Sequence, residues 1–302
     1  MRRTRTLAGI GIAAAALLAL TACNSGTPAD PGGDTGDGGE TGGDSTWFEV
    51  ASDVTLDGSP TFDNMTARDG VVIGVKEDQP GLGYLDVTTG ERTGFDVDIA
   101  RWIAASLGFE EDQIEFKAIA SANREQSLVN GDIDYYVGTY SITDKRKEII
   151  DFAGPYFVTG QGLLVGSDSD IESEADLTAD TTVCSATGST PIQNIRDNYP
   201  EVPTREFDLY SACVEALLND EVQAVTTDQA ILIGYAAQDP DNLKVVGEPF
   251  TEERYGVGLT KGDAALQEHI NTLFTDGGDI WQAIFDANLG SSGIEVEQPE
   301  VD

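Results

Sequence analysis

Several polar residues that could bind a small charged molecule follow the predicted strands of this chain. Lys76 and Glu77 come directly after the first predicted strand, and residues 138–141 come after a later one. In the second half of the chain, residues 188–190 and Asp228 take corresponding places. Because ligands of open α/β sheets bind at the carboxyl ends of the strands, we expect these residues to surround one site.

Arg146 suggests which ligand this site would bind. It follows Thr143, which can cap a short helix, so its guanidinium lies near free backbone N–H groups that favour an anion. A guanidinium can hold a carboxylate through two parallel hydrogen bonds, and Asp228 offers the opposite charge. Together they fit the two charged groups of an α-amino acid. The alternatives are a solvated surface arginine and an aspartate that only caps a helix.

Two blocks of alternating strand and helix patterns must position these residues, and they predict two parallel-sheet α/β lobes. In the first block we expect strands at 71–75, 114–119 and 133–138, a helix at 96–107, and helices capped by Ser121 and Thr143. In the second we expect strands at 181–185, 205–207, 222–227 and 243–246, a helix capped by Thr190 with Pro191 at its first position, and helices at 211–218 and 231–237. Two closing helices are expected at 264–274 and 280–289.

Residues 1–22 have the pattern of an export signal. Three arginines precede an apolar stretch at 7–20, which is too short to span a membrane. The stretch runs into Leu-Thr-Ala-Cys, which looks like a bacterial lipobox. We therefore expect the signal to be removed and Cys23 to be lipidated, anchoring the protein at the extracellular face of the cell membrane. The alternative is an ordinary signal peptide with a chance cysteine, and twin-arginine export stays open.

The regions beside the body have different compositions. Residues 23–46 are almost entirely glycine, acidic, hydroxyl and proline residues, which predicts a flexible acidic tether. Residues 47–65 are more apolar and are not placed by the sequence, and residues 296–302 form an acidic tail. The tether lacks the ligand order of a calcium-binding loop, so we expect no metal there.

The charge of the chain excludes some partners. It has 54 acidic and 17 basic residues, for a formal net charge of −37. Such a surface repels nucleic acid and anionic lipid, so we expect no binding to either.

The cysteines agree with export. Once Cys23 carries lipid, Cys184 and Cys213 remain, and a remaining pair in an exported chain should form a disulfide. The alternative is two buried free thiols. The chain has a single histidine, His269, so we expect no metal site. We also expect no cofactor.

Four segments carry a family resemblance. "GFDVDIA", "NGDIDYYVGTYSITDKRKEIIDFAGPYF", "ATGSTP" and "VQAVTTD" occur in this order along the chain. In order and spacing they resemble the family 3 extracellular solute-binding proteins, which are the polar-amino-acid receptors of ABC importers. The resemblance covers about residues 68–290. Within the family the chain is most similar to the glutamate/glutamine-binding lipoproteins of actinobacterial importers.

The resemblance implies a type II periplasmic-binding-protein-like fold, in which two α/β lobes are joined by two crossing segments. Lobe 1 would comprise residues 66–158 and 251–295, and lobe 2 residues 159–250, with crossings near 157–162 and 247–254. A monomer would close on an amino acid and deliver it to a membrane permease.

The resemblance also assigns roles to single residues. Arg146, Thr139 and Ser141 would hold the ligand α-carboxylate and help with the ammonium. Ser189 and Thr190 would add carboxylate contacts from lobe 2, and Asp228 would bind the ammonium. Many relatives have paired hydroxyls where this chain has Gly138 and Thr139, so one side-chain contact is expected to be missing.

The ligand side chain is predicted from two further cations. Lys76 and Arg124 should lie at the carboxyl edge of the lobe 1 sheet, where they fit a distal carboxylate. We therefore expect L-glutamate in preference to L-glutamine and L-aspartate. The alternative for Arg124 is a surface ion pair with Glu125.

A few relatives of this fold are enzymes, such as cyclohexadienyl dehydratases. Glu77 is the one obvious candidate for a general acid or base. We expect a binding protein and not an enzyme.

Overall fold

The structure is a computed structural model that describes residues 47–302. The predicted signal at 1–22, the lipidation site Cys23 and the tether at 23–46 lie outside the described residues. Within 47–302, none of the helices combines the length and the apolar character that crossing a membrane requires.

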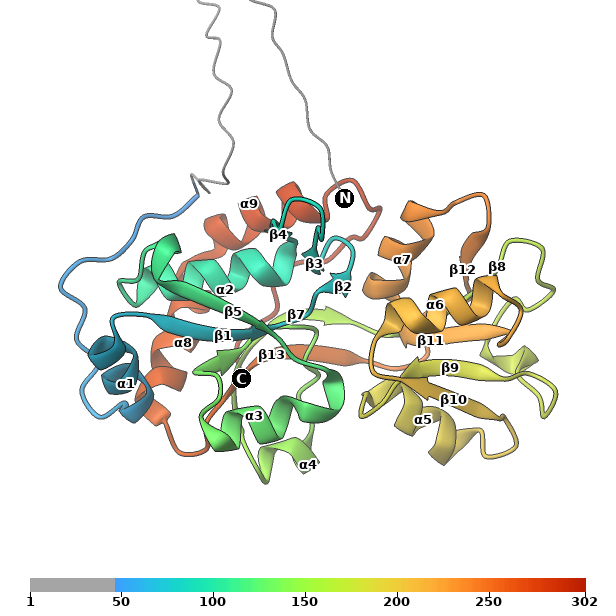
Figure 1. The fold of residues 1–302 in the computed structure, drawn as a ribbon, viewed down its shortest axis with the longest axis horizontal. Coiled ribbons are helices and arrows are strands. Elements are labelled where there is room, and N and C mark those ends of the chain that lie inside the picture. Colours follow the sequence, from blue (N-terminus) through green and yellow to red (C-terminus); the bar gives the residue numbers. More distant parts are fainter. Residues whose placement is uncertain (1–46) are drawn as a thin grey trace, which may run out of the picture. The chain divides into compact units, whose positions relative to one another are not determined.

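The first five-stranded sheet defines lobe 1 (Figure 1). Its order is β5-β1-β6-β13-β7, and β1 pairs in parallel with β5 and β6, whereas β13 is antiparallel to β6 and β7. The strands are β1 (Val71–Val75), β5 (Ile114–Ala118), β6 (Tyr135–Tyr136), β7 (Asp151–Thr159) and β13 (Glu253–Leu259).

The second five-stranded sheet defines lobe 2, with the order β10-β9-β11-β8-β12. Here β9 is parallel to β10 and β11, whereas β8 is antiparallel to β11 and β12. The strands are β8 (Gln161–Gly166), β9 (Val183–Ala186), β10 (Thr204–Phe207), β11 (Ala224–Asp228) and β12 (Leu243–Val246).

Both sheets are therefore mixed, and the prediction of parallel sheets was wrong for the strands next to the crossings. A parallel neighbour needs a crossover connection such as a helix. Strand β8 instead follows β7 after a single residue, Gly160, and β13 follows β12 through residues 247–252. These strands enter each sheet from the other lobe, and that route sets their direction.

The two crossing segments lie side by side. Thr159 pairs with Glu253, the amide of Gln161 donates to Thr251 Oγ1 at 3.0 Å, and the amide of Phe250 donates to the Gln161 carbonyl at 2.9 Å. A Cβ atom at Gly160 would lie 2.3 Å from the Thr251 carbonyl oxygen, so only glycine allows this approach. The two-lobe α/β fold joined by two crossing segments is confirmed.

Helices cover both sheets. Those of lobe 1 are α1 (Pro60–Arg68), α2 (Phe95–Ser106), α3 (Arg124–Asn130), α4 (Asp144–Lys147), α8 (Ala264–Asp276) and α9 (Gly278–Asn288), with short 3₁₀ turns at Glu111–Gln113 and Ser121–Asn123. Those of lobe 2 are α5 (Thr190–Asn198), α6 (Tyr210–Leu218) and α7 (Gln229–Gln238), with a 3₁₀ turn at Glu174–Asp176. A small sheet of β2 (Asp78–Gln79), β3 (Gly83–Leu85) and β4 (Arg92–Thr93) was not predicted, because strands of two or three residues show no measurable periodicity.

The core of lobe 1 is rich in aromatic rings. The Phe95 ring meets the edge of Trp281 with centroids 5.7 Å apart, and Trp281 stacks on Phe285 at 5.3 Å. Burial of each such side chain contributes about 1.5–3 kcal/mol. Phe95 and Trp281 are fully buried, so this cluster fixes the start of α2 against α9.

Residues 47–65, which the sequence did not place, are part of lobe 1. Ser59 caps α1 by accepting from the Phe62 amide at 3.1 Å, and its hydroxyl donates to Asp263 at 2.9 Å. Trp47 and Phe48 pack against the core. At the other end, Asp302 pairs with Arg254, so residues 296–302 lie along the same lobe.

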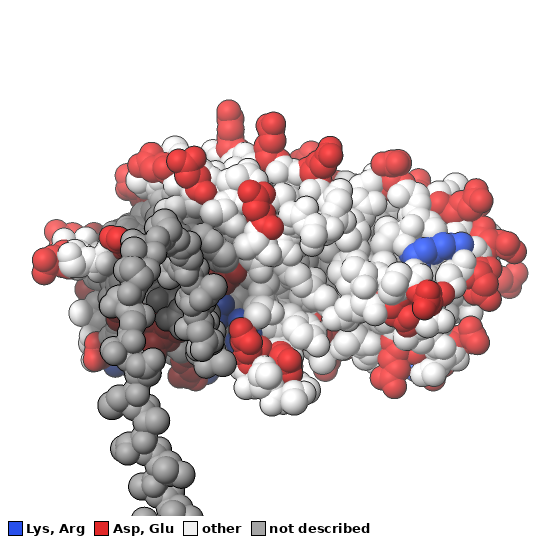
Figure 2. Space-filling model, turned by 90° about the horizontal axis from the view of Figure 1, so that it is seen from above, with Lys and Arg blue, Asp and Glu red and all other residues white. Residues whose placement is uncertain are grey.

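The surface is strongly acidic, as the composition requires. Figure 2 shows Asp and Glu side chains spread over the visible face, with few Lys or Arg between them.

Candidate functional site

The predicted binding residues come together where the two lobes meet. From lobe 1, Ser141 Oγ lies 3.2 Å from Thr190 Oγ1 of lobe 2. Arg146 Nη2 and Arg124 Nη2 both donate to the Gly188 carbonyl, at 3.2 and 3.4 Å. The lobes are thus in contact through the loops that the sequence placed at the strand ends.

Several hydrogen bonds hold the Arg146 side chain in place. Thr143 caps α4 by accepting from the Arg146 amide at 3.2 Å, as predicted. The sequence pattern also placed Ile149 and Ile150 in this helix, but the helix ends at Lys147. The guanidinium donates to Glu125 Oε1 at 3.1 Å and to the Ser141 carbonyl at 2.7 Å, and the residue is 8% exposed. Burial and the neighbouring charge of Arg124 lower the pKa of Arg146 below its ordinary value.

Arg124 lies beside Arg146 and is 2% exposed. It donates to the Ser121 carbonyl at 3.0 Å and to the Thr139 carbonyl at 3.5 Å. The alternative that Arg124 only pairs with Glu125 was wrong, because Glu125 pairs with Arg146.

The ring of Tyr140 brings the two arginines together. The Arg124 guanidinium carbon lies 4.2 Å and that of Arg146 4.9 Å from the ring centroid. A cation attracted by a desolvated ring face gains about 2 kcal/mol. Tyr140 thereby offsets part of the repulsion between two buried cations.

Lys76 adds a third cation, and it changes the role expected of Ser121. Its Nζ donates to Ser121 Oγ at 2.7 Å, so this hydroxyl does not cap a helix, and α3 begins at Arg124 without a side-chain cap. Lys76 is 3% exposed. Burial, followed by the charge of Arg124, lowers the pKa of Lys76 to about 7.

Two hydroxyl residues of lobe 2 begin α5. Ser189, and not Thr190 as predicted, is the cap, since its Oγ accepts from the Ile192 amide at 3.3 Å. Pro191 is consequently the second helical residue. The prediction was off by one residue because it assumed that the proline is the first helical residue, whereas it is the second. Thr190 Oγ1 donates instead to Glu253 Oε2 at 3.0 Å, which links α5 to a crossing segment.

Asp228 ends β11 and precedes α7, but its side chain does not cap that helix. Its Oδ2 accepts from the Tyr255 hydroxyl at 2.7 Å, and within residues 47–302 its buried Oδ1 has no hydrogen-bond partner. Burial, followed by the charge of Glu253, raises the pKa of Asp228 to about 8. The alternative of a simple helix cap was therefore wrong.

Sequence reasoning missed three residues of this site. Asp96 accepts from the Thr139 amide at 2.9 Å, and Gln79 Oε1 accepts from Thr139 Oγ1 at 3.2 Å. Glu253 accepts a hydrogen bond from Thr190, and its charge raises the pKa of Asp228. Asp96 lies within the motif "GFDVDIA", which was a usable signal, whereas Gln79 lies in a two-residue strand that gives none.

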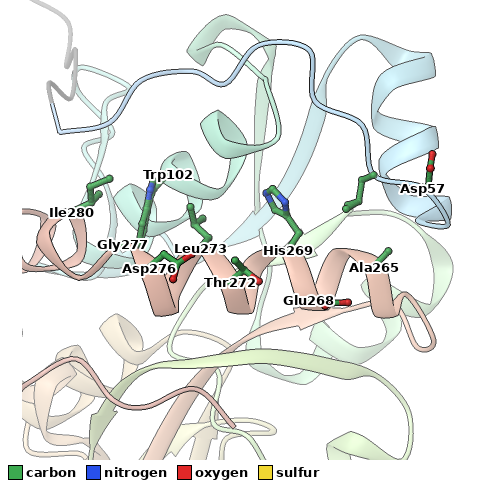
Figure 3. Close-up of a pocket in the computed structure, with 11 residues that line it drawn as sticks. Asp57, Trp102, Ala265, Glu268, His269, Thr272, Leu273, Asp276, Gly277 and Ile280 are labelled. Atoms are coloured by element: carbon green, nitrogen blue, oxygen red, sulfur yellow. The ribbon is translucent and has the colours of Figure 1, made fainter.

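A pocket of about 570 Å³ lies elsewhere in lobe 1, and Figure 3 shows the residues that line it. Leu56 and Asp57 of the N-terminal segment line it together with residues of α8, and the Nε2 atom of His269 in α8 lies 3.0 Å from Ser106 Oγ. None of the predicted binding residues lines this pocket. Among residues 47–302, no group of three or more His, Cys, Asp or Glu side chains is arranged to hold a metal ion.

The disulfide between Cys184 and Cys213 is present, as predicted. It joins β9 to α6, and both residues are fully buried. The bond lies within lobe 2 and does not cross between the lobes.

The two-lobe fold is that of an extracellular solute-binding protein. The family model of the bacterial extracellular solute-binding proteins, family 3, matches residues 71–277, and the chain belongs to this family. The resemblance that the four sequence segments carry is thereby confirmed.

Individual relatives with similar sequences are also named as amino-acid-binding proteins. The chain is 41% identical over 242 residues to "Glutamate-binding protein GluB" of Corynebacterium efficiens, covering 76% of this chain and 81% of the relative. It is 42% identical over 210 residues to "Glutamine-binding protein" of Geobacillus stearothermophilus, covering 70% and 80%.

Solved structures are similar too. A cysteine-binding protein from Campylobacter jejuni has a TM-score of 0.74 at 28% identity, covering 80% of this chain and 98% of that one. An ancestral arginine-binding protein bound to glutamine has a TM-score of 0.67 at 31% identity, covering 74% and 98%.

These relatives are named as binding proteins, which supports the expectation that the chain is not an enzyme. The residue considered for catalysis, Glu77, is half-exposed and lies 3.9 Å from the Arg92 guanidinium.

Proposed function

We propose that this protein is the receptor of an ABC amino-acid importer and binds L-glutamate between its lobes. The observation that supports this most is the charge arrangement at the lobe contact. Lobe 1 supplies two buried arginines, and lobe 2 supplies the buried carboxyl of Asp228, whose pKa responds to both arginines. Relatives named for glutamate and for glutamine, and one named "ABC transporter glutamine-binding protein GlnH" from Bacillus subtilis at 42% identity over 204 residues, point the same way.

The proposed contacts divide the ligand into three groups. Arg146 binds the α-carboxylate, helped by hydroxyls of Thr139, Ser141, Ser189 and Thr190. Asp228 binds the ammonium through its Oδ1, which otherwise has no partner among residues 47–302. A buried polar atom without a partner is destabilising, so a ligand that satisfies it gains affinity.

The distal carboxylate of glutamate is assigned to Lys76 and Arg124. Lys76 is already buried beside Arg124, and their mutual repulsion contributes to the low pKa of Lys76. A bound carboxylate would neutralise this excess positive charge. Glutamine has the same shape, but its amide leaves the cations without a counter-charge.

Binding and closure are coupled in this proposal. A ligand held by Arg146 and Asp228 contacts both lobes at once, which is possible only when they are closed. The membrane permease would recognise the closed form. We further propose that a monomer is anchored by lipid at Cys23 after removal of residues 1–22, with residues 23–46 as its tether. The lobe boundaries at 158/159 and 250/251 likewise remain predictions.

Calorimetric titration of the tag-free mature protein with L-glutamate, L-glutamine, L-aspartate and L-arginine tests the ligand. Glutamate should bind most tightly, and glutamine should lose about 2–3 kcal/mol, or roughly 30- to 150-fold, because a buried cation loses its partner. Equal affinity for glutamate and glutamine, or a preference for arginine, would contradict the glutamate assignment.

A further inference from the structure

Thr139 has an unusual backbone conformation. Its φ is 48°, in the left-handed region that a β-branched residue rarely occupies. Such a conformation persists only where the surroundings hold it in place. Thr139 comes directly after Gly138, at the turn that leads from β6 to the arginine of α4.

Asp96 is the group that holds this turn. Its Oδ2 accepts from the Thr139 amide at 2.9 Å, and its Oδ1 accepts from the Tyr156 hydroxyl at 2.8 Å. Asp96 and Tyr156 are both fully buried. One carboxylate, from the first turn of α2, therefore ties the turn after β6 to strand β7.

The conformation of Thr139 sets the position of the groups around the two arginines. Its carbonyl accepts from Arg124, and its hydroxyl donates to Gln79. The next residue, Tyr140, stacks on both guanidinium groups, and the carbonyl after that, of Ser141, accepts from Arg146 at 2.7 Å. A change of peptide orientation at Thr139 would displace all of these contacts.

We infer that Asp96 is a positioning residue for ligand binding: it fixes the left-handed turn at Thr139 and thereby aligns Arg124 and Arg146. Asp96 itself does not bind the ligand. This inference rests on the proposed function for its affinity measurements, but the hold on Thr139 can be measured without any ligand.

An alternative role for Asp96 is purely electrostatic, as a buried negative charge near Lys76. The two roles differ in what asparagine can replace. An asparagine at this position can accept from the Thr139 amide through its oxygen and donate to the Tyr156 hydroxyl through its nitrogen. Asp96→Asn therefore keeps the turn but removes the charge, whereas Asp96→Ala removes both.

The first measurement is hydrogen exchange of the ligand-free protein at the Thr139 amide. Protection should be present in the wild type and in Asp96→Asn, and it should be lost in Asp96→Ala. Retained protection in Asp96→Ala, with the fold intact by circular dichroism, would overturn the inference whatever the ligand is.

The second measurement is calorimetric affinity for L-glutamate and L-glutamine. Asp96→Ala should weaken binding of both by about 10- to 100-fold, since a hydrogen bond to a charged group is lost and the arginines move. Asp96→Asn should recover most of this loss. Tyr156→Phe removes the other partner of Asp96 but keeps its bond to the Thr139 amide, so it should weaken binding less than Asp96→Ala does.

A double-mutant cycle separates the turn from general destabilisation. Glycine takes the left-handed conformation without steric cost, so a chain with Thr139→Gly needs Asp96 less. Adding Asp96→Ala in that background should weaken binding by no more than about twofold, whatever Thr139→Gly does alone. An undiminished effect of Asp96→Ala in that background, or an Asp96→Asn variant as weak as Asp96→Ala, would overturn the positioning role.

If the wild type binds neither amino acid, the proposed ligand is wrong, and the hydrogen-exchange experiment still decides whether Asp96 holds the turn at Thr139.

Discussion

Tyr255 donates a 2.7 Å hydrogen bond from its hydroxyl to Oδ2 of Asp228. Tyr255 lies on β13, the strand that returns the chain to lobe 1, and Asp228 ends β11 of lobe 2. The bond therefore ties a proposed ligand-binding carboxyl to the segment about which the lobes would move. It also leaves Oδ1 as the oxygen that can meet a ligand.

The buried carboxyl of Asp228 should make the ligand-free protein less stable at alkaline pH. Its pKa is about 8 in the folded protein and 3.8 for an ordinary aspartate. Between these values the folded state binds more protons than the unfolded state, so its contribution to stability is lost as the pH rises. Asp228→Asn should therefore melt at a higher temperature than the wild type at pH 8, with little difference at pH 4. Thermal melting at both pH values checks this, and a lower melting temperature at pH 8 would contradict it.

Ligand binding should move protons in two opposite directions. The ammonium favours ionised Asp228, which releases a proton near pH 7, whereas a distal carboxylate favours charged Lys76, whose pKa is about 7, and takes one up. The two effects should largely cancel in the wild type. Calorimetry with L-glutamate in buffers of different ionisation enthalpy should show net release in Lys76→Met and net uptake in Asp228→Asn. The same proton balance in all three proteins would speak against the assigned contacts.

Arg146→Ala should weaken amino-acid binding by about 2–5 kcal/mol, because the ligand carboxylate would be buried without its main partner. Arg146→Lys should recover little, since an ammonium cannot form two parallel hydrogen bonds. Glu125→Gln is a useful control, as it removes the ion pair to Arg146 but keeps the guanidinium in place. Titration calorimetry of the three variants measures these effects. Binding by Arg146→Ala within about twofold of the wild type would rule out the carboxylate assignment.

Local patterns predicted the parts of the fold that depend on neighbours in sequence. Short-range periodicity and helix-start chemistry predict three such features. These are the cap at Thr143, the buried face of α2, and the strand ends at Lys76 and Asp228. The disulfide followed from the count of cysteines in an exported chain.

Contacts between distant segments could not be predicted in this way. The sequence around Ser121 predicts a helix cap, but its hydroxyl accepts a hydrogen bond from Lys76, which follows the distant strand β1. The hydrogen bond from the Thr139 amide to Asp96 joins residues that are 43 positions apart in the sequence. Strand β8 is antiparallel to β11 because it enters the sheet from the other lobe. Strand propensity predicts where a strand lies in the sequence but not its direction in the sheet.

Gly234→Ala should disfavour the closed arrangement of the lobes. A Cβ atom at Gly234 in α7 of lobe 2 would lie 2.3 Å from the carbonyl oxygen of Pro80 in lobe 1. The same contact region includes the Ser211 amide, which donates to Asp78 at 3.0 Å. The clash exists only when the lobes meet, so ligand dissociation should accelerate while ligand-free stability changes little.

Stopped-flow measurement of ligand dissociation and small-angle scattering of the lobe arrangement test this prediction for Gly234→Ala. Gly278→Ala, also at a helical glycine but facing only the flexible Gln298 side chain, is the control. Unchanged dissociation in Gly234→Ala would mean that this contact does not limit closure.

Arg124 should decide between glutamate and glutamine. It is almost fully buried beside Lys76 and Arg146, and Glu125 does not pair with it. Arg124→Ala removes one of the two cations assigned to the distal carboxylate but leaves the groups proposed for the α-carboxylate and ammonium. We therefore expect glutamate to lose much more affinity than glutamine, so that their ratio falls below about tenfold or inverts.

Parallel titrations of Arg124→Ala with both amino acids measure this ratio, and Lys117→Ala, which removes a cation at the lobe 1 surface, controls for net charge. A ratio that stays at the wild-type value would remove Arg124 from the specificity site. An equal loss for both ligands would instead place it with the groups that bind the shared α-amino-acid part.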